Sequence, residues 1–147
     1  MTTLRDTTLV DASVPADATF ADAARAISQV EIGAIAVVDA DGRVVGLFTA
    51  DDLVRGLFPG YLREMEHTIF LESDRQALEP RLDRSAARPV REFCQPPLTV
   101  ELDADLAHVA ERFLHSPHDS VAVVERRRFV GMLGQVEFCR ALMRKTG

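Results

Sequence analysis

The chain repeats itself once, and this internal repeat constrains its fold more than any other feature. Residues 14–39 align with residues 100–125 without a gap. Residues 43–48 then align with residues 128–133, after the loss of one residue at a turn. Each copy of such a repeat is one supersecondary unit that buries its apolar face against its neighbour. We therefore expect two similar halves that pack together.

The first copy has the pattern of a β-α-β-β-α unit. Apolar residues recur at helical spacing over 20–27, after candidate N-cap residues. Residues 35–38 and 43–48 predict two strands of a hairpin, because Gly42 of the intervening Asp-Gly pair tolerates a positive φ. A second helix is expected over 49–57. Its inward-facing residues are expected to be Leu53, Val54 and Leu57.

The second copy repeats these elements in the same order. The sequence predicts helices over 106–114 and 135–144, and strands over 120–124 and 129–133. The expected fold class is therefore α/β (α+β), with two β-α-β-β-α repeats and a helical insert between them.

The insert, residues 59–88, has no counterpart in either copy. It predicts two helices, the second bent or broken near Pro80. The first has an apolar face of Tyr61, Leu62, Met65, Ile69 and Phe70. The second has Ser73 or Asp74 as its cap and Ala77, Leu78 and Leu82 as apolar residues. The insert is either a long packed connection or a surface for self-association or an effector protein. The expected division is repeat 1 at 1–58, the insert at 59–88 and repeat 2 at 89–147.

Composition narrows the classes of partner. The chain has 147 residues and a net charge of −6, which disfavours non-specific nucleic-acid binding. No apolar run reaches the roughly 20 residues that span a membrane, and residues 1–11 lack the apolar core of a secretory signal. We expect a cytoplasmic protein in which Cys94 and Cys139 are reduced, small core residues.

Three stretches carry a resemblance to a known family. They are Val14–Thr19, Ala36–Gly42 and Gly46–Asp52, the last reading Gly-Leu-Phe-Thr-Ala-Asp-Asp. They resemble the cystathionine-β-synthase (CBS) domain, which occurs in tandem pairs called Bateman modules. The last stretch is similar to the Gly-hydrophobic-x-Thr-x-x-Asp ligand signature of that family.

The resemblance implies a fold and a role. Two CBS units would pair about a pseudo-twofold axis, with ligand clefts between them, and the module would form a homodimer. The implied regulatory ligands are AMP, ADP, ATP or S-adenosylmethionine, with no required cofactor. Ligand binding would then bias an associated effector protein.

The first copy has the residue types that such a ligand needs. Gly46 permits close backbone approach, and Thr49 offers a hydroxyl beside the free N–H groups of a helix start. Asp52, one turn further on, can accept from two ribose hydroxyls. An apolar adenine slot would be walled by Ile35 and Ala36, together with the backbone around Ser13. The alternative interpretation is that Thr49 and Asp52 are only a helix-capping pair.

The second copy departs from the signature. Gly134 stands at the Thr position and removes its hydroxyl, and Glu137 stands at the Asp position. Thr99 still offers a hydroxyl near the cleft. The family usually has Pro where Ala36 and Ala122 stand, which alters the pocket wall. We expect a good site around Thr49 and Asp52 and a weak or empty second site.

Other chemistry-bearing residues favour structural roles. His115 and His118 are separated by a helix-breaking Pro117 and lack further metal ligands. His67 and His108 have no evident partner for catalysis. The run 126–128 is Arg-Arg-Arg, which indicates either a solvated hairpin tip or an anion contact.

The sequence therefore predicts a regulatory binding module that is not an enzyme and needs no metal. The rival hypothesis is a dimeric interaction scaffold that has lost its ligand. No nucleophile–base pair, metal-ligand cluster or Walker-type phosphate loop is present in the sequence.

Overall fold

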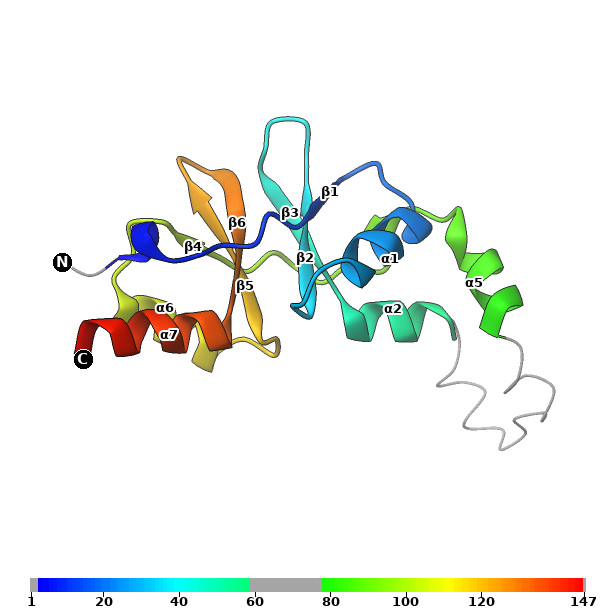
Figure 1. Ribbon diagram of the computed structural model, residues 1–147. Helices are drawn as coiled ribbons and strands as arrows, with labels where there is room; N and C mark the ends of the chain where they lie inside the picture. The colour runs from blue at the N-terminus through cyan, green and yellow to red at the C-terminus, as the bar shows by residue number, and fades with distance from the viewer. Residues whose placement is uncertain (1–2, 59–77, 147) are drawn as a thin grey trace.

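The computed structural model describes residues 3–58 and 78–146 (Figure 1). Helices and strands follow one another in the order that the repeat predicts. Repeat 1 consists of η1 (Leu4–Asp6), β1 (Ser13–Pro15), α1 (Phe20–Ser28), β2 (Ala34–Val38), β3 (Val44–Thr49) and α2 (Ala50–Gly56). The connection and repeat 2 consist of α5 (Leu78–Ala86), η2 (Val90–Glu92), β4 (Thr99–Glu101), α6 (Leu106–Leu114), β5 (Ser120–Glu125), β6 (Arg128–Gly134) and α7 (Gln135–Thr146).

The two repeats form equivalent three-stranded sheets, β1-β2-β3 and β4-β5-β6. In each sheet the first two strands are parallel and the last two are antiparallel. A helix connects each parallel pair, as parallel strands require a crossover connection. The predicted fold class, two β-α-β-β-α units, is confirmed.

The crossover helices α1 and α6 are defined by the same local signals. Thr19 caps α1: its hydroxyl accepts from the Asp22 N–H at 3.2 Å, and the Asp22 carboxylate accepts from the Thr19 N–H at 3.0 Å. Asp105 caps α6 by accepting from the His108 N–H at 2.8 Å. The residues buried by these helices are Phe20, Ala23 and Ile27 on α1 and Leu106, Val109 and Phe113 on α6.

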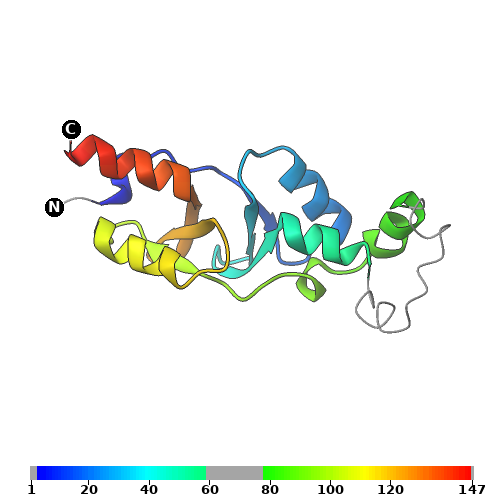
Figure 2. The same ribbon diagram turned by 90° about the horizontal axis from the view of Figure 1, so that it is seen from below.

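The two sheets pack against each other through an apolar core. Strand β2 packs against β5 and β6. Ala122 and Met132 of repeat 2 belong to the same buried cluster as Ile35 and Leu47 of repeat 1. The helices α6 and α7 lie at one end of the molecule and α1 and α2 toward the other, with the strands between them (Figure 2).

Each repeat also sends its leading segment to the sheet of the other. Val10 and Met132 exchange backbone hydrogen bonds of 2.9 and 2.7 Å, which places the N-terminal arm, residues 3–12, beside β6. Leu47 and Gln95 exchange bonds of 3.0 and 2.7 Å, which places the segment before β4 beside β3. The ribbon shows the arm crossing from repeat 2 to β1 (Figure 1). The segment between α5 and β4, residues 87–98, is called the connecting segment below. This exchange brings its residue Gln95 next to repeat 1.

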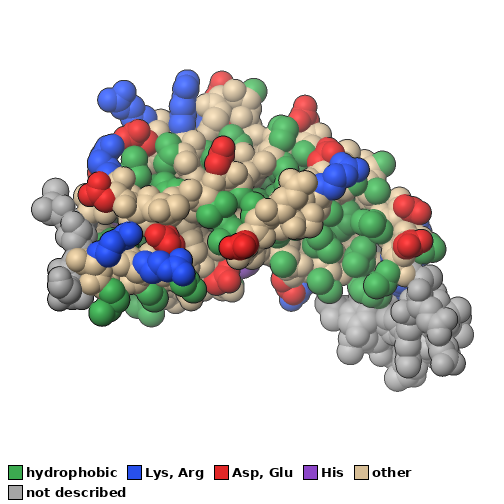
Figure 3. All heavy atoms as spheres, viewed as in Figure 1, with side chains coloured by type: hydrophobic (Ala, Val, Ile, Leu, Met, Phe, Trp, Pro, Cys, Tyr) green, Lys and Arg blue, Asp and Glu red, His purple; other side chains and the backbone are tan. Residues whose placement is uncertain are grey.

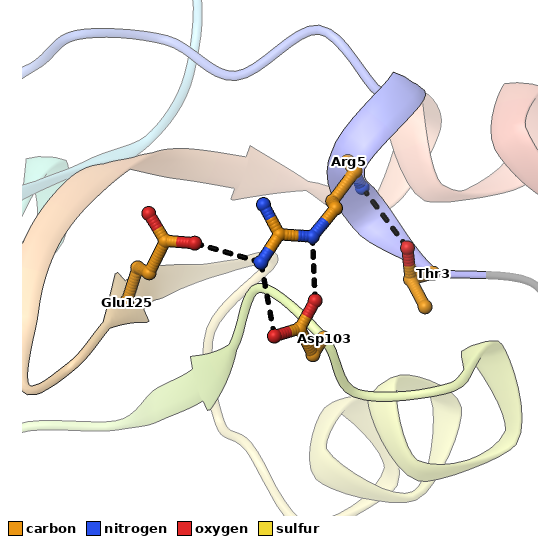
Figure 4. Close-up of polar contacts among 4 residues, drawn as sticks. All are labelled: Thr3, Arg5, Asp103 and Glu125. Carbon is orange, nitrogen blue, oxygen red and sulfur yellow. Dashed lines mark hydrogen bonds and ion pairs between the residues drawn. The ribbon is translucent and has the colours of Figure 1, made fainter.

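The N-terminal arm is held by one buried and one charged residue. Leu4 is fully buried in the core of repeat 2. Arg5 forms a forked contact with Asp103, at 2.6 and 2.9 Å, and a further contact with Glu125 at 2.7 Å (Figure 4). The Arg5 guanidinium lowers the pKa of the Asp103 carboxyl.

The two hairpin turns differ in their backbone chemistry. In the β2–β3 turn, Gly42 has a φ of 84°, as the sequence predicts. In the β5–β6 turn, Arg126 and Arg127 have φ values of 52° and 69°. Residues with a Cβ rarely adopt this left-handed region, so the second turn is strained. Lys or Arg side chains project at the upper left of the space-filling view, the region to which this hairpin points (Figures 1 and 3).

Helix α5 packs through polar rather than apolar residues. Ser85 donates to the Gly56 carbonyl at 2.6 Å, and Arg81 donates to the Leu57 carbonyl at 3.5 Å. Both side chains are buried. They therefore satisfy carbonyl groups left free at the C-terminal end of α2.

Several residue-level expectations prove wrong. Val54 was expected to face inward, but it is 55% exposed, because the buried face of α2 consists of Asp52 and Gly56. Cys139 is exposed rather than a core residue. The described part of the insert helix, Leu78–Ala86, continues through Pro80 without a break. The predicted helix over 61–70 and the cap at Ser73 or Asp74 lie outside the described residues.

Candidate functional site

The candidate site is built on the start of helix α2. Thr49 is its N-cap, and its hydroxyl accepts from the Asp52 N–H at 3.0 Å. The Asp52 Oδ2 atom accepts in return from the Thr49 N–H at 2.9 Å. The two side chains are 5% and 3% exposed, so this capping box is buried. The helix-capping pair, which is the alternative interpretation of Thr49 and Asp52 from the sequence, is therefore present.

The second carboxylate oxygen of Asp52 has a partner from the connecting segment. The Gln95 side-chain amide donates to Asp52 Oδ1 at 2.6 Å. Gln95 reaches this position because its backbone pairs with Leu47 of β3. One side chain thus joins the end of repeat 1 to the segment that leads into repeat 2.

Gly46 makes this close approach feasible. A Cβ at Gly46 would lie 2.8 Å from Cys94 Sγ and 3.1 Å from the Gln95 carbonyl oxygen. Gly46 was predicted to admit a ligand. In the structure, the space beside it is filled by the connecting segment.

Burial and the nearby Asp52 charge raise the pKa of the Cys94 thiol. The thiol is therefore protonated at neutral pH.

A hollow of about 290 Å³ opens beside Asp52. This is close to the lower end of the roughly 300–1,000 Å³ range for small-molecule sites. Its walls come from α2 and from the segment that follows α5. The lining residues are Asp52, Arg55, Gly56, Arg88, Glu92, Phe93 and Gln95.

The hollow carries charges of both signs. Arg55 contacts Asp51 at 2.7 Å, and Arg88 contacts Glu92 at 2.7 Å. Each of these four side chains is well exposed, so both ion pairs are solvated and weak. The arginines can therefore exchange these partners for an anionic ligand at little cost.

Of the predicted first-site residues, only Asp52 lines the hollow. Ile35 and Ala36 are fully buried in the sheet, and Ser13 lies opposite Ala36 on β1 with its side chain exposed. Thr49 is buried behind the carboxylate as its capping partner. The structure brings Thr49 and Asp52 together and places the predicted adenine wall elsewhere.

The other lining residues were not singled out from the sequence. Arg88, Glu92, Phe93 and Gln95 lie in the connection, where they follow no repeat pattern that marks a site. Arg55 carried the weak signal of standing one turn after Asp52 on the same helix. Gln95 reaches Asp52 only because of the exchange between repeats, which periodicity does not reveal.

The second-copy residues have a different arrangement. Gly134 stands before α7 with room for a side chain, since a Cβ there would lie 3.5 Å from Ile32 Cγ2. Glu137 is largely buried and contacts Arg140 at 3.0 Å and Arg144 at 3.8 Å. The Thr99 carbonyl accepts from Arg112 at 3.1 and 3.0 Å, and Ala122 is fully buried. The capping box of the first copy is therefore replaced by ion pairs.

Neither a metal-ligand cluster nor a membrane-spanning helix is found among the described residues. Over 3–58 and 78–146, no three His, Cys, Asp or Glu side chains are grouped so as to hold a metal ion. His115 ends α6 as its C-cap, and His118 donates its backbone N–H to Ser116. In the same ranges, no helix has the length and apolar character needed to cross a membrane.

Comparison with family models decides the family. The CBS domain model matches residues 5–58 and 90–144, which together make up most of the chain. The chain belongs to the CBS domain family. The two matched segments coincide with the two β-α-β-β-α units, so the protein is a tandem CBS pair. Among curated proteins, no match to the chain is found.

Solved structures of CBS proteins share this fold. A CBS domain-containing protein of unknown function from Kribbella flavida superposes with a TM-score of 0.75 at 19% identity, covering 97% of this chain and 99% of that one. The CBS domain of a membrane protein from Sphaerobacter thermophilus gives 0.71 at 21% identity, covering 96% and 88%. The protein CBSX2, solved in complex with AMP, gives 0.63 at 18% identity, covering 100% and 95%.

Proposed function

We propose that this CBS pair is a regulatory module that binds an adenosine-type ligand in the hollow beside Asp52. The observation that carries the proposal is a buried carboxylate, Asp52, that lines a hollow together with two arginines, Arg55 and Arg88. The candidate ligands are AMP, ADP, ATP and S-adenosylmethionine. The AMP complex of CBSX2 supports this choice at the level of the shared fold.

The lining residues suit the parts of a nucleotide. Asp52 can accept from ribose hydroxyls, and Arg55 and Arg88 can bind phosphate oxygens through charge-assisted hydrogen bonds. The Phe93 ring packs against Phe20, and the Arg88 guanidinium lies over it, 5.2 Å from its centroid. A base would stack on this ring only after Arg88 had turned toward the phosphate. The net charge of −6 does not oppose such binding, because the two arginines act locally.

Regulation would follow from the position of the hollow. Its walls belong to α2 of repeat 1 and to the segment that leads into β4 of repeat 2. A ligand that contacts both can favour one arrangement of the repeats, provided that its affinity differs between arrangements. A separate effector protein would respond to that arrangement, and the module itself would perform no catalysis.

A ligand-free scaffold remains the second candidate, because one observation favours it. Both oxygens of Asp52 already have protein partners, Thr49 and Gln95. In this case the module would act only as a homodimer. Val54 on α2 and Val136 on α7 are exposed apolar residues that a second copy could cover.

Isothermal titration calorimetry with the four ligands tests the proposal. At least one ligand is expected to bind, and Arg88→Ala is expected to weaken it about ten-fold or more, since a hydrogen bond to a charged group is lost. Arg91→Ala is the matched control, because Arg91 is an exposed arginine of the same segment that does not line the hollow. Absence of heat with all four ligands at millimolar concentration, together with a stable dimer in light scattering, would favour the scaffold.

A further inference from the structure

We propose that the Gln95 amide is an internal competitor for the Asp52 oxygen that a ribose hydroxyl needs, so that Gln95 sets the affinity and sugar specificity of the site. This inference rests on the proposed nucleotide binding and adds the residue that controls it. The observation behind it is the 2.6 Å hydrogen bond from Gln95 Nε2 to Asp52 Oδ1.

The two oxygens of Asp52 have separate tasks. Oδ2 accepts from the Thr49 N–H in the buried capping box. A ligand that bound Oδ2 would have to break the hydrogen bond that caps the start of α2. Oδ1 accepts from Gln95, and both Asp52 and Gln95 line the hollow. A carboxylate oxygen can accept two hydrogen bonds, but Asp52 is only 3% exposed and the Gln95 amide covers Oδ1 at 2.6 Å. A hydroxyl that approaches Oδ1 from the hollow must therefore take the place of that amide.

The Gln95 side chain can change its rotamer while the Gln95 backbone stays in place. Its N–H and carbonyl are both bonded to Leu47, at 2.7 and 3.0 Å. Its side chain has three rotatable bonds and is only partly buried. Displacement by a ligand thus requires a rotamer change and leaves the pairing of the connecting segment with β3 intact.

The competition has a measurable size. A hydrogen bond to a charged group stabilises by an amount that corresponds to about ten-fold or more in affinity. A ligand with ribose hydroxyls must overcome this bond. A ligand that lacks them leaves Gln95 in place and gains nothing from its removal. Removal of the amide should therefore help only ligands with hydroxyl groups on the sugar.

The test measures dissociation constants for AMP and ATP and for their 2′,3′-dideoxy counterparts. Wild type, Gln95→Ala and Gln135→Ala are compared by calorimetry. Gln135 is an exposed glutamine at the start of α7 and serves as the matched control. Gln95→Ala is expected to bind the ribonucleotide about ten-fold more tightly and the dideoxynucleotide equally, while Gln135→Ala matches wild type. Circular dichroism verifies that each variant is folded.

Each other outcome has a defined meaning. Unchanged or weaker ribonucleotide binding by Gln95→Ala would overturn the competition but leave nucleotide binding standing. An equal gain for both sugars would also overturn it, because relief of steric crowding does not depend on hydroxyls. Binding by Gln95→Ala but not by wild type would support the competition. Absence of binding to every variant would overturn the proposed function, and this inference with it.

Discussion

At the residue scale, Asp52 combines a structural and a candidate binding role in one carboxylate. Oδ2 completes the capping box with Thr49, and Oδ1 accepts from Gln95, which lines the hollow together with Asp52. From the sequence alone these two roles are alternatives, because a Thr-x-x-Asp pattern fits both. The capping contact uses Oδ2, and the proposed ribose contact would use Oδ1. A capping role for Asp52 is therefore compatible with a binding role.

The same scale gives a prediction for Gly46. Gly46→Ala is expected to destabilise the fold by about 1–3 kcal/mol, because the new methyl group would overpack against Cys94 and Gln95. Gly134→Ala is the matched control, since a Cβ there meets Ile32 at an ordinary 3.5 Å. Urea unfolding measures both variants. Equal stability of the two variants would show that the connecting segment does not press against β3 as described.

At the element scale, the helices and strands of both repeats follow from the sequence, and their surroundings do not. Helix α6 spans the predicted residues, Leu106–Leu114, because its apolar spacing and the Asp105 cap act locally. Val54 and Cys139 were assigned to buried faces, although both are exposed. Periodicity shows that a helix has an apolar side, but it does not show how far a neighbour covers that side.

The β5–β6 turn yields the prediction at this scale. Arg126→Asn with Arg127→Gly is expected to stabilise the protein by about 1 kcal/mol, because Asn-Gly suits the positive φ values of this turn. Gly42→Ala in the equivalent hairpin should have the opposite effect, since Gly42 also has a positive φ. Thermal unfolding measures both changes. A loss of stability in the Asn-Gly variant would show that the β5–β6 turn of the wild type is not strained.

At the scale of the whole molecule, the exchange of leading segments determines what the sequence could reveal. The repeat predicts two similar units, and the family match confirms them. The contacts of Gln95 with Asp52 and of Arg5 with Asp103 join residues far apart in the chain. They arise from one repeat's leading segment lying on the other repeat. No local pattern encodes such contacts, so the hollow could not be assembled from the sequence.

The buried end of the N-terminal arm supplies a first prediction at this scale. Leu4→Ala is expected to destabilise the protein by about 2–4 kcal/mol, because Leu4 fills a fully buried place in the core of repeat 2. Leu114→Ala, at a site 82% exposed, should change stability by less than about 0.5 kcal/mol. Chemical unfolding compares them. A small effect at Leu4 would show that the arm is not part of the core.

The charged contact of the arm supplies a pH prediction. Arg5 lowers the pKa of Asp103 in the folded state, so this contact stabilises folding above the ordinary pKa of 3.8 and is lost as the pH falls through the lowered value. Asp103→Asn is expected to be less stable than wild type at neutral pH, and the difference should disappear in strong acid. A difference that persists at low pH would contradict the role of this charge.

The central claim is that the hollow beside Asp52 receives a nucleotide, and a crystal structure grown with AMP tests it most directly. The account predicts density for AMP in the hollow, with its ribose on Asp52 Oδ1, its phosphate near Arg55 or Arg88, and the Gln95 side chain turned away. Density for AMP at another site, or an empty hollow with Gln95 still bonded to Asp52 at saturating AMP, would contradict the claim.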